Sequence, residues 1–232
     1  NILIIPREEA VTARKKNGVL LRGPHVLTKE HLRQMKAVDK RLKVIVCKKE
    51  DAEKYVGDAD IIAGNPATIP EITHAKKLQW IHSFSAGMDR VLTPEVAQSN
   101  ILLSNSSGIH KTPIAEYVLG AMLIFGRGFL PAMKNQERRV WGKGENLTEL
   151  CGKKVLVVGL GNIGGEVARL ASCFGAHVIA VTRSTREQVQ GIERMHKPSD
   201  LMRVLPRADF VVSCLPHTKE THHLFDMKKF KA

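Results

Sequence analysis

The chain has 232 residues, with 36 Lys and Arg against 23 Asp and Glu, which gives a formal net charge of +13. A composition that is 43% hydrophobic and 25% charged is that of an ordinary globular protein, and it excludes a disordered, collagen-like or low-complexity chain. The length suits one large domain or two modest ones. The positive residues are dispersed, which favours a solvated surface over a nucleic-acid partner.

The sequence predicts neither a membrane segment nor a secreted protein. The least polar stretch, residues 112–126, is interrupted by Glu116 and is shorter than a membrane span. Residues 1–5 lack the basic leader and the length of a secretory signal. Four cysteines are scattered along the chain without a C-x-x-C pair: Cys47, Cys151, Cys173 and Cys214. We expect buried thiols in a reducing cytoplasm, with no disulfide framework and no metal site.

Strand and helix signals alternate over the first hundred residues. The predicted strands are residues 2–5, 43–47, 59–63, 78–82 and 101–103. Helical or turn segments separate them, including a helix that begins at Thr28 and a turn with Pro94 at the first helical position. Repeated β-then-α order requires crossover connections, which form a parallel sheet with helices on its faces. This half is therefore predicted to be an open α/β domain.

A long apolar helix and a second α/β unit are predicted in the other half. The helix covers residues 112–125 and is apolar nearly all round, so we expect it to be buried between two domains. Predicted strands at 153–158, 177–181 and 208–213 alternate with predicted helices at 162–174 and 198–205. A complete dinucleotide domain has about six strands, so we expect a chain truncated at its C-terminus. A small natural variant with fewer strands is the alternative.

A glycine-rich turn joins the first strand and helix of the second unit. Gly159, Gly161 and Gly164 form the pattern G-x-G-x-x-G, which is weak alone. Here it follows a buried strand and opens a helix within a βαβ unit, which is the arrangement that binds dinucleotides. The glycines permit a tight turn, a close approach of pyrophosphate and close helix–strand packing, and the helix N-terminus attracts the anion. The alternative is a structural glycine turn.

The end of the second strand indicates which dinucleotide is bound. An NAD site usually has Asp or Glu there, which accepts hydrogen bonds from the adenosine ribose. This chain instead has two arginines among three hydroxyl residues: Thr182, Arg183, Ser184, Thr185 and Arg186. Arg binds a 2′-phosphate bidentately, whereas a carboxylate would repel it. NADP(H) is therefore favoured; the alternative is a solvated loop that accepts either NADP(H) or NAD(H).

A second loop of small residues follows a predicted strand of the first half. Small side chains at Ser85, Ala86 and Gly87 leave backbone N–H groups accessible to an anionic group such as a carboxylate. An ordinary strand-to-helix turn is the alternative.

Four motifs in this order resemble the D-isomer-specific 2-hydroxyacid dehydrogenases. They are Ser85-Ala-Gly-Met-Asp89, Ile114-Ala-Glu-Tyr117, Gly159-Leu-Gly-Asn-Ile-Gly164 and Cys214-Leu-Pro-His-Thr218. The chain looks most like the NADPH-preferring glyoxylate/hydroxypyruvate reductase branch, because the family's acidic position after the second strand falls on Thr182.

The resemblance implies a flavodoxin-like substrate domain at residues 1–105 and an incomplete Rossmann dinucleotide-binding domain at 106–232. By similarity, the backbone of Ala86 and Gly87 would hold the substrate carboxylate. The implied cofactor-binding residues are Gly159, Gly161, Asn162, Ile163, Gly164, Thr182, Arg183, Ser184, Arg186, Leu215, Pro216 and Thr218. Family members are usually dimers, so we expect a homodimer whose contact includes residues 127–145.

The resemblance also implies an enzyme whose catalytic residues are not in this chain. The family's Arg, Glu and His lie after the Cys214–Thr218 motif, and we expect them beyond Ala232. The expected reaction is hydride transfer between NADP(H) and a small 2-oxo or 2-hydroxy acid such as glyoxylate or hydroxypyruvate. The alternative is a non-catalytic, dinucleotide-sensing scaffold of the same fold, like the C-terminal-binding corepressors.

Overall fold

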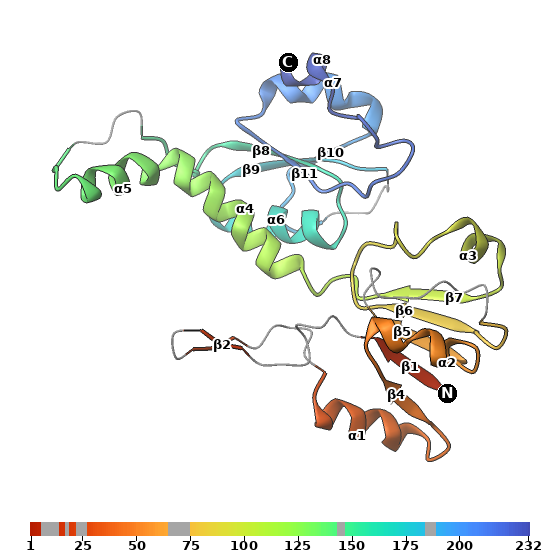
Figure 1. The fold of residues 1–232 in the computed structure, drawn as a ribbon. Helices are drawn as coiled ribbons and strands as arrows, with labels where there is room; N and C mark the ends of the chain where they lie inside the picture. The colour runs from red at the N-terminus through yellow and green to blue at the C-terminus, as the bar shows by residue number, and fades with distance from the viewer. Residues whose placement is uncertain (6–13, 17–18, 22–26, 65–74, 143–146, 184–188) are drawn as a thin grey trace. The chain divides into compact units, whose positions relative to one another are not determined.

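The computed structural model describes residues 1–5, 14–16, 19–21, 27–64, 75–142, 147–183 and 189–232. The chain divides into two compact units, Asn1–Ser107 and Gly108–Ala232 (Figure 1). The sequence-based boundary lies two residues earlier, after residue 105.

A parallel sheet of five strands forms the centre of the first unit. Its strands are β1 (Ile2–Ile5), β4 (Val44–Val46), β5 (Ile61–Gly64), β6 (Trp80–Ser83) and β7 (Leu102–Asn105). The hairpin strands are β2 (Arg14–Lys16) and β3 (Val19–Leu21), and the helices are α1 (Lys29–Val38), η2 (Lys49–Asp51), α2 (Glu53–Val56) and α3 (Pro94–Gln98). In the sheet the strands follow the order β4-β1-β5-β6-β7. Counted along the chain this is 2-1-3-4-5, the order of flavodoxin-like sheets.

One face of this sheet carries the core of the first unit. Leu3, Ile62 and Ile81 pack with residues of α2 and α3, such as Val56 and Val96, while the alternate residue Ile4 is fully buried as well. The two helices are short, and α3 begins with the capping residues that the sequence predicts. Thr93 caps α3, with its hydroxyl accepting from the N–H of Val96 and Pro94 at the first helical position.

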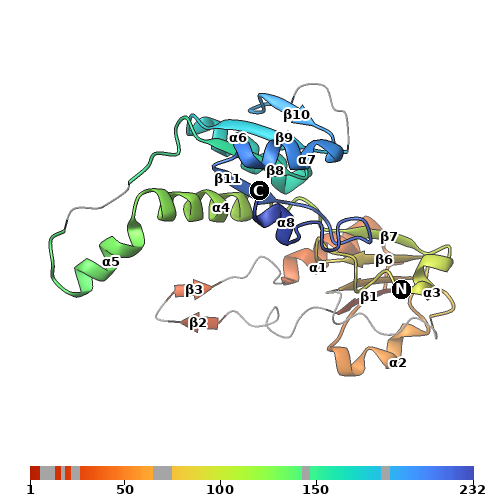
Figure 2. The ribbon, with the colours of Figure 1, turned by 90° about the horizontal axis from the view of Figure 1, so that it is seen from above.

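The second unit contains a four-stranded parallel sheet with helices on both faces (Figures 1 and 2). Its strands are β8 (Lys154–Val158), β9 (His177–Val181), β10 (Arg194–His196) and β11 (Phe210–Ser213). Its helices are α4 (Lys111–Gly126), α5 (Phe129–Glu137), α6 (Asn162–Cys173), η4 (Pro198–Asp200), α7 (Leu201–Val204), η5 (Leu205–Arg207) and α8 (Met227–Phe230). The strand order β10-β9-β8-β11 is 3-2-1-4 along the chain, which is the beginning of the Rossmann order. The two sheets confirm the predicted fold class.

Strand β8 is buried on both of its faces, and its side chains divide the core of this unit in two. Val155 and Val157 pack with α4 and α6 on one face of the sheet. Leu156 and Val158 pack with α7 on the other face. A strand buried on both faces needs an unbroken apolar run, and residues 155–158 supply it.

Helix α4 differs from its prediction, because only one of its faces is buried. Ala115, Leu119 and Met122 follow helical spacing and pack into the core that contains α6. Tyr117 and Phe125 are 78% and 75% exposed. The helix is apolar all round, but the residues that the structure describes cover a single stripe of it.

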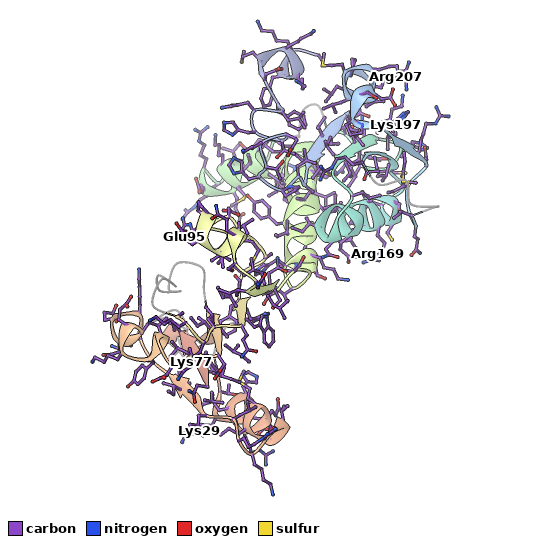
Figure 3. The ribbon with its side chains drawn as sticks, turned by 90° about the vertical axis from the view of Figure 1, so that its right-hand side faces the viewer. Lys29, Lys77, Glu95, Arg169, Lys197 and Arg207 are labelled. Carbon is purple, nitrogen blue, oxygen red and sulfur yellow. The ribbon has the colours of Figure 1, made fainter. Side chains whose placement is uncertain are left out.

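Charged side chains are spread over the outside of both units. The six labelled in Figure 3, which range from Lys29 to Arg207, belong to different helices and loops of the two units. Several pair locally, as when Lys77 donates to Asp58 at 2.7 Å. Among the described residues no single helix has the length and apolarity to cross a bilayer, and only α4 with α5, bent by 69°, meets that criterion as a pair.

Candidate functional site

The site in the second unit lies where three strands end at one level. Val158 of β8 is in register with Val181 of β9 and with Ser213 of β11. The loops that follow these strands therefore leave the sheet side by side. β9 and β11 flank β8, so the three loops lie together outside the carboxyl ends of these strands. In doubly wound sheets this is the place where ligands bind.

Gly159 turns the chain sharply after β8. Its φ of +98° lies in the region that favours glycine, and a Cβ there would stand 2.8 Å from the carbonyl oxygen of Cys214. The loop after β11 thus passes directly against the glycine turn. A side chain at Gly159 would separate the two loops that border the site.

Gly161 and Gly164 differ in what surrounds them. Gly164 is buried, and a Cβ on it would stand 2.0 Å from the carbonyl oxygen of Gly159, so α6 begins in direct contact with the turn. Gly161 is the N-cap of α6 and has no atom within 4 Å of its Cβ position. The first backbone N–H groups of a helix have no partner within it, and here they adjoin open space.

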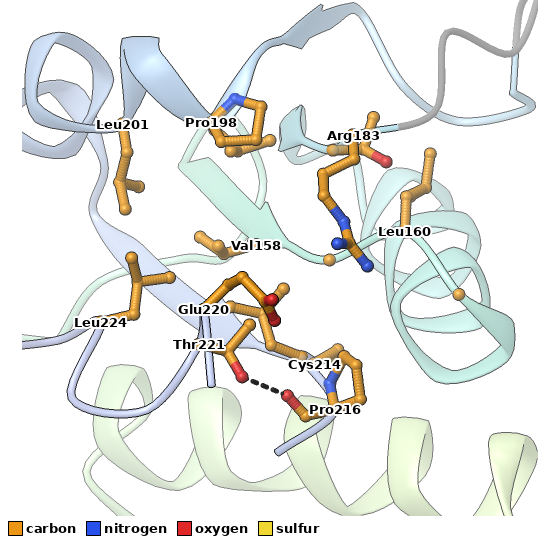
Figure 4. Close-up of a pocket in the computed structure, with 15 residues that line it drawn as sticks. Val158, Leu160, Arg183, Pro198, Leu201, Cys214, Pro216, Glu220, Thr221 and Leu224 are labelled. Atoms are coloured by element: carbon orange, nitrogen blue, oxygen red, sulfur yellow. Dashed lines mark hydrogen bonds between the residues drawn. The ribbon is translucent and has the colours of Figure 1, made fainter. Parts of the chain in front are cut away.

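A cavity of about 530 Å³ opens between these loops (Figure 4). The elements around it are the ends of β8, β9 and β11, the start of α7, and the loop that follows β11. The residues that line it are Val158, Gly159, Leu160, Gly161, Val181, Thr182, Arg183, Pro198, Leu201, Cys214, Leu215, Pro216, Glu220, Thr221 and Leu224. Its volume falls within the range of small-molecule sites, and its walls are mostly apolar.

Six of the cofactor-binding residues predicted from the sequence line this cavity: Gly159, Gly161, Thr182, Arg183, Leu215 and Pro216. Four others do not: Asn162, Ile163, Gly164 and Thr218. Ile163 packs against the hydrophobic core, and the Thr218 N–H donates a hydrogen bond to Oγ1 of the lining residue Thr221. Ser184 and Arg186 lie outside the described residues.

Glu220 and Thr221 are among the nine lining residues that sequence reasoning did not assign to the site. The Thr221 hydroxyl donates to the carbonyl of Pro216, which closes the loop after β11 (Figure 4). Two threonines at a spacing of three residues are a recognised turn-closing pattern, so the spacing of Thr218 and Thr221 was an available signal. Nothing in the sequence indicates that Glu220 faces the end of β9.

The loop with the predicted carboxylate-binding residues lies in the first unit, directly after β6. Asn105 donates to the carbonyl of Ala86 at 2.7 Å, and the N–H of Ser106 donates to the carbonyl of Ser85 at 3.3 Å. Two residues at the end of β7 therefore hold the loop by its carbonyl groups. Within the part of the chain that the structure describes, neither the Ala86 nor the Gly87 N–H donates to a protein acceptor.

His82 supports this loop through a chain of hydrogen bonds. The Trp80 indole N–H donates to Ser104 Oγ at 2.8 Å, so the Ser104 hydroxyl is free to donate to His82 Nδ1, also at 2.8 Å. His82 Nε2 then bears the proton and faces Ser106 Oγ at 3.4 Å. Burial lowers the pKa of His82, which agrees with a neutral ring.

Residues 119–232 match the family model described as D-isomer specific 2-hydroxyacid dehydrogenase, NAD binding domain. The D-3-phosphoglycerate dehydrogenase of Methanocaldococcus jannaschii is 28% identical over 180 residues, covering 76% of this chain and 34% of the relative. The glyoxylate reductase of Thermofilum pendens is 30% identical over 162 residues, covering 68% of this chain and 48% of that relative. A crystal structure of a D-isomer specific 2-hydroxyacid dehydrogenase family protein from Aeromonas salmonicida is 30% identical, with a TM-score of 0.76 over 97% of this chain and 66% of that chain.

The chain belongs to the D-isomer specific 2-hydroxyacid dehydrogenase family. It spans about a third to a half of the length of the two curated relatives. The cofactor of the family's NAD-binding domain is a nicotinamide dinucleotide.

The second unit of this dehydrogenase-family chain fits such a cofactor. A Cβ at Gly161 would fill the open space before α6, which is the space that a pyrophosphate needs. Leu160, Leu215 and Pro216 give the adjoining cavity apolar walls, which suit a flat adenine ring. Arg183 adds one positive charge after β9, where the described residues carry no carboxylate.

The cysteines correct one expectation from the sequence. Cys151 and Cys173 are exposed thiols, whereas Cys47 and Cys214 are half-buried. Burial raises the pKa of the Cys214 thiol, so it lines the cavity as a neutral group. No disulfide joins the four cysteines, and no cluster of three or more His, Cys, Asp or Glu among the described residues is arranged to hold a metal ion.

Proposed function

We propose that the chain is part of an NADPH-dependent reductase of small 2-oxo acids, of the glyoxylate or hydroxypyruvate type. The observation that carries the proposal is the cavity at the ends of β8, β9 and β11. Arg183 lines it after β9, at the strand end where an NAD site usually has a carboxylate. Arg binds phosphate oxygens bidentately, and a 2′-phosphate is the group that distinguishes NADPH from NADH.

The proposed cofactor contacts follow the order of the loops. Gly159, Gly161 and Gly164, with Asn162 and Ile163 at the start of α6, would hold the pyrophosphate. Thr182 and Arg183, together with Ser184 and Arg186, would surround the 2′-phosphate. Leu215 and Pro216 would contact the adenosine, with Thr218 behind them. A bound nicotinamide supplies the hydride for reduction of a carbonyl carbon.

The proposed substrate contact lies in the first unit. The N–H groups of Ala86 and Gly87 would bind the substrate carboxylate. Asn105 and Ser106 hold the loop by its carbonyl groups. Both N–H groups therefore keep a fixed position and remain available to donate hydrogen bonds to a ligand. The proposal assigns no catalytic proton donor to a residue of this chain.

The reaction is tested by following NADPH oxidation with the full-length protein. Glyoxylate, hydroxypyruvate and pyruvate are the substrates, and NADH is run alongside. Turnover with a preference for NADPH supports the proposal. Cofactor binding without turnover of any of these acids contradicts it and favours the non-catalytic scaffold.

We also propose a homodimer in the cytoplasm. The exposed apolar side chains on α4, on α5 and after α5 include Tyr117, Phe125, Met133 and Trp141, and Trp141 is 99% exposed. An exposed apolar set of this kind is typical of an interface. Exposed unpaired thiols at Cys151 and Cys173 persist in a reducing compartment. Sedimentation equilibrium of the wild type and of Phe125→Glu tests the dimer, and a monomeric wild type contradicts it.

A further inference from the structure

A carboxylate enters the cofactor cavity from the loop after β11. Glu220 lines the same cavity as Arg183, although β9 itself ends without an acidic residue. In Figure 4 the Arg183 guanidinium and the Glu220 carboxylate extend into the cavity from different sides. The sheet order explains this, because β9 and β11 flank β8 and their loops border the same space.

A closed turn fixes the position of Glu220. The Thr218 N–H donates to Thr221 Oγ1 at 2.8 Å, and the Thr221 N–H donates to Thr218 Oγ1 at 3.3 Å. The Thr221 hydroxyl also donates to the carbonyl of Pro216. Glu220 lies inside this turn, so its backbone is held by hydrogen bonds on both sides. The turn therefore fixes the backbone position from which the exposed Glu220 side chain reaches the cavity wall.

Glu220 is negatively charged at neutral pH. A hydrogen bond with the Thr218 side chain and the charge of Arg183 both lower the pKa of the Glu220 carboxyl. The two side chains are not in ion-pair contact, so the Arg183 guanidinium is not neutralised by Glu220 directly. A ligand in the cavity is thus exposed to one positive and one negative group.

We propose that Glu220 is a specificity-determining residue that opposes the 2′-phosphate and so limits the preference for NADPH over NADH. This inference rests on the proposed function. A phosphate monoester carries about −1.5 to −2 charges at pH 7. A 2′-phosphate held by Arg183 is repelled by the carboxylate on the other side of the cavity, whereas NADH carries only the pyrophosphate charges that both cofactors share. Glu220 therefore opposes NADPH more strongly than NADH.

The test is calorimetric binding to the full-length protein and to Glu220→Gln, which removes the charge and keeps the shape. The ligands are NADPH, NADH, 2′,5′-ADP and 5′-AMP, so that the readout does not depend on turnover. We expect NADPH and 2′,5′-ADP to bind roughly two- to fivefold more tightly to the variant at low ionic strength, with the gain shrinking as salt is added. NADH and 5′-AMP, which lack the 2′-phosphate, are expected to gain clearly less affinity than NADPH and 2′,5′-ADP, and an equal gain for all four ligands overturns the inference.

Glu149→Gln is the matched control, because it removes the same charge from an exposed position of the second unit that does not line the cavity. It is expected to leave all four affinities unchanged. Unchanged or weaker binding of NADPH to Glu220→Gln overturns the inference. Weaker binding of NADH also overturns it, because Glu220 would then accept hydrogen bonds from the ribose.

Failure of this inference is distinguishable from failure of the proposed function. Arg183→Ala is measured in the same series. If Arg183→Ala loses NADPH affinity while Glu220→Gln leaves it unchanged, the 2′-phosphate assignment stands and the role of Glu220 is wrong. If Arg183→Ala binds NADPH as the wild type does, both are wrong.

Discussion

Gly164 lies so close to Gly159 that a Cβ on Gly164 would stand 2.0 Å from the Gly159 carbonyl oxygen. Helix α6 therefore packs directly against the turn that ends β8. This contact sets the distance between the N-terminus of α6 and the strand, and the open space before Gly161 depends on it. The two glycines are needed for packing, whereas the open space at the Gly161 Cβ position means that packing does not require a glycine there.

The first prediction is that Gly164→Ala destabilises the second unit. The added methyl would collide with backbone, and Val157 Cγ1 lies only 3.1 Å away, so the helix must move. Overpacking of this kind costs about 1–3 kcal/mol. Urea unfolding of the full-length protein measures the loss. A variant as stable as the wild type would show that α6 is not in contact with the turn.

The second prediction separates ligand binding from folding by means of Gly161 and Gly165. Neither has an atom within 4 Å of its Cβ position. Gly161→Ala is expected to fold normally and to bind NADPH and NADH at least tenfold more weakly, because the methyl occupies the pyrophosphate space. Gly165→Ala, inside α6, is the control and is expected to gain about 0.5–1 kcal/mol of stability. Unchanged cofactor affinity in Gly161→Ala would contradict the placement of the pyrophosphate.

Sequence patterns predicted the elements whose conformation is determined by local sequence. The apolar run of β8 is bounded by Gly159, and the strand ends where the run does. The edge strand β10 was missed, since Arg194–His196 has no apolar alternation and exists only through its pairing with β9. Helix α5 was missed as well, because its first residues, beginning at Phe129, are exposed and lack an amphipathic pattern.

In the candidate site, too, residues set by local sequence were predicted and a residue brought in by tertiary structure was not. The glycine pattern and Arg183 follow directly from strand ends, which the sequence indicates well. Glu220 follows β11, and its approach to the end of β9 depends on the order of strands in the sheet. A single sequence does not specify that order, so a residue brought in by tertiary structure was not found.

A third prediction concerns His82, which we expect to stay neutral at pH 7. Protonation of Nδ1 would remove the acceptor of the Ser104 hydroxyl, and burial already lowers the pKa below 6.5. Because the unfolded chain binds a proton more readily, this contribution to stability is lost as pH falls below about 6.5. NMR titration of the ring measures the pKa. In His82→Gln the fall in unfolding free energy between pH 7.5 and 5.5 should be smaller than in the wild type, and an equal fall would refute the argument.

A fourth prediction ranks the reactivity of the cysteines. Cys151 and Cys173 are exposed, whereas burial raises the pKa of both Cys47 and Cys214. The thiolate is the reactive form, so iodoacetamide at pH 7.5 should label Cys151 and Cys173 first. Mass spectrometry of the labelled peptides gives the order. Fastest labelling at Cys214 would mean that the cavity wall is open to solvent and that its thiol is not held neutral.

The most direct test of the central claim is the affinity of Arg183→Ala for NADPH and for NADH. Loss of a charge-assisted contact to phosphate is expected to cost about 1.5–3 kcal/mol, which is roughly a 10- to 150-fold rise in the Kd for NADPH. The Kd for NADH should change by less than about twofold. Arg207→Ala, an exposed arginine of the same unit that does not line the cavity, should change neither. Equal weakening of NADPH and NADH by Arg183→Ala would contradict the assignment of this residue to the 2′-phosphate.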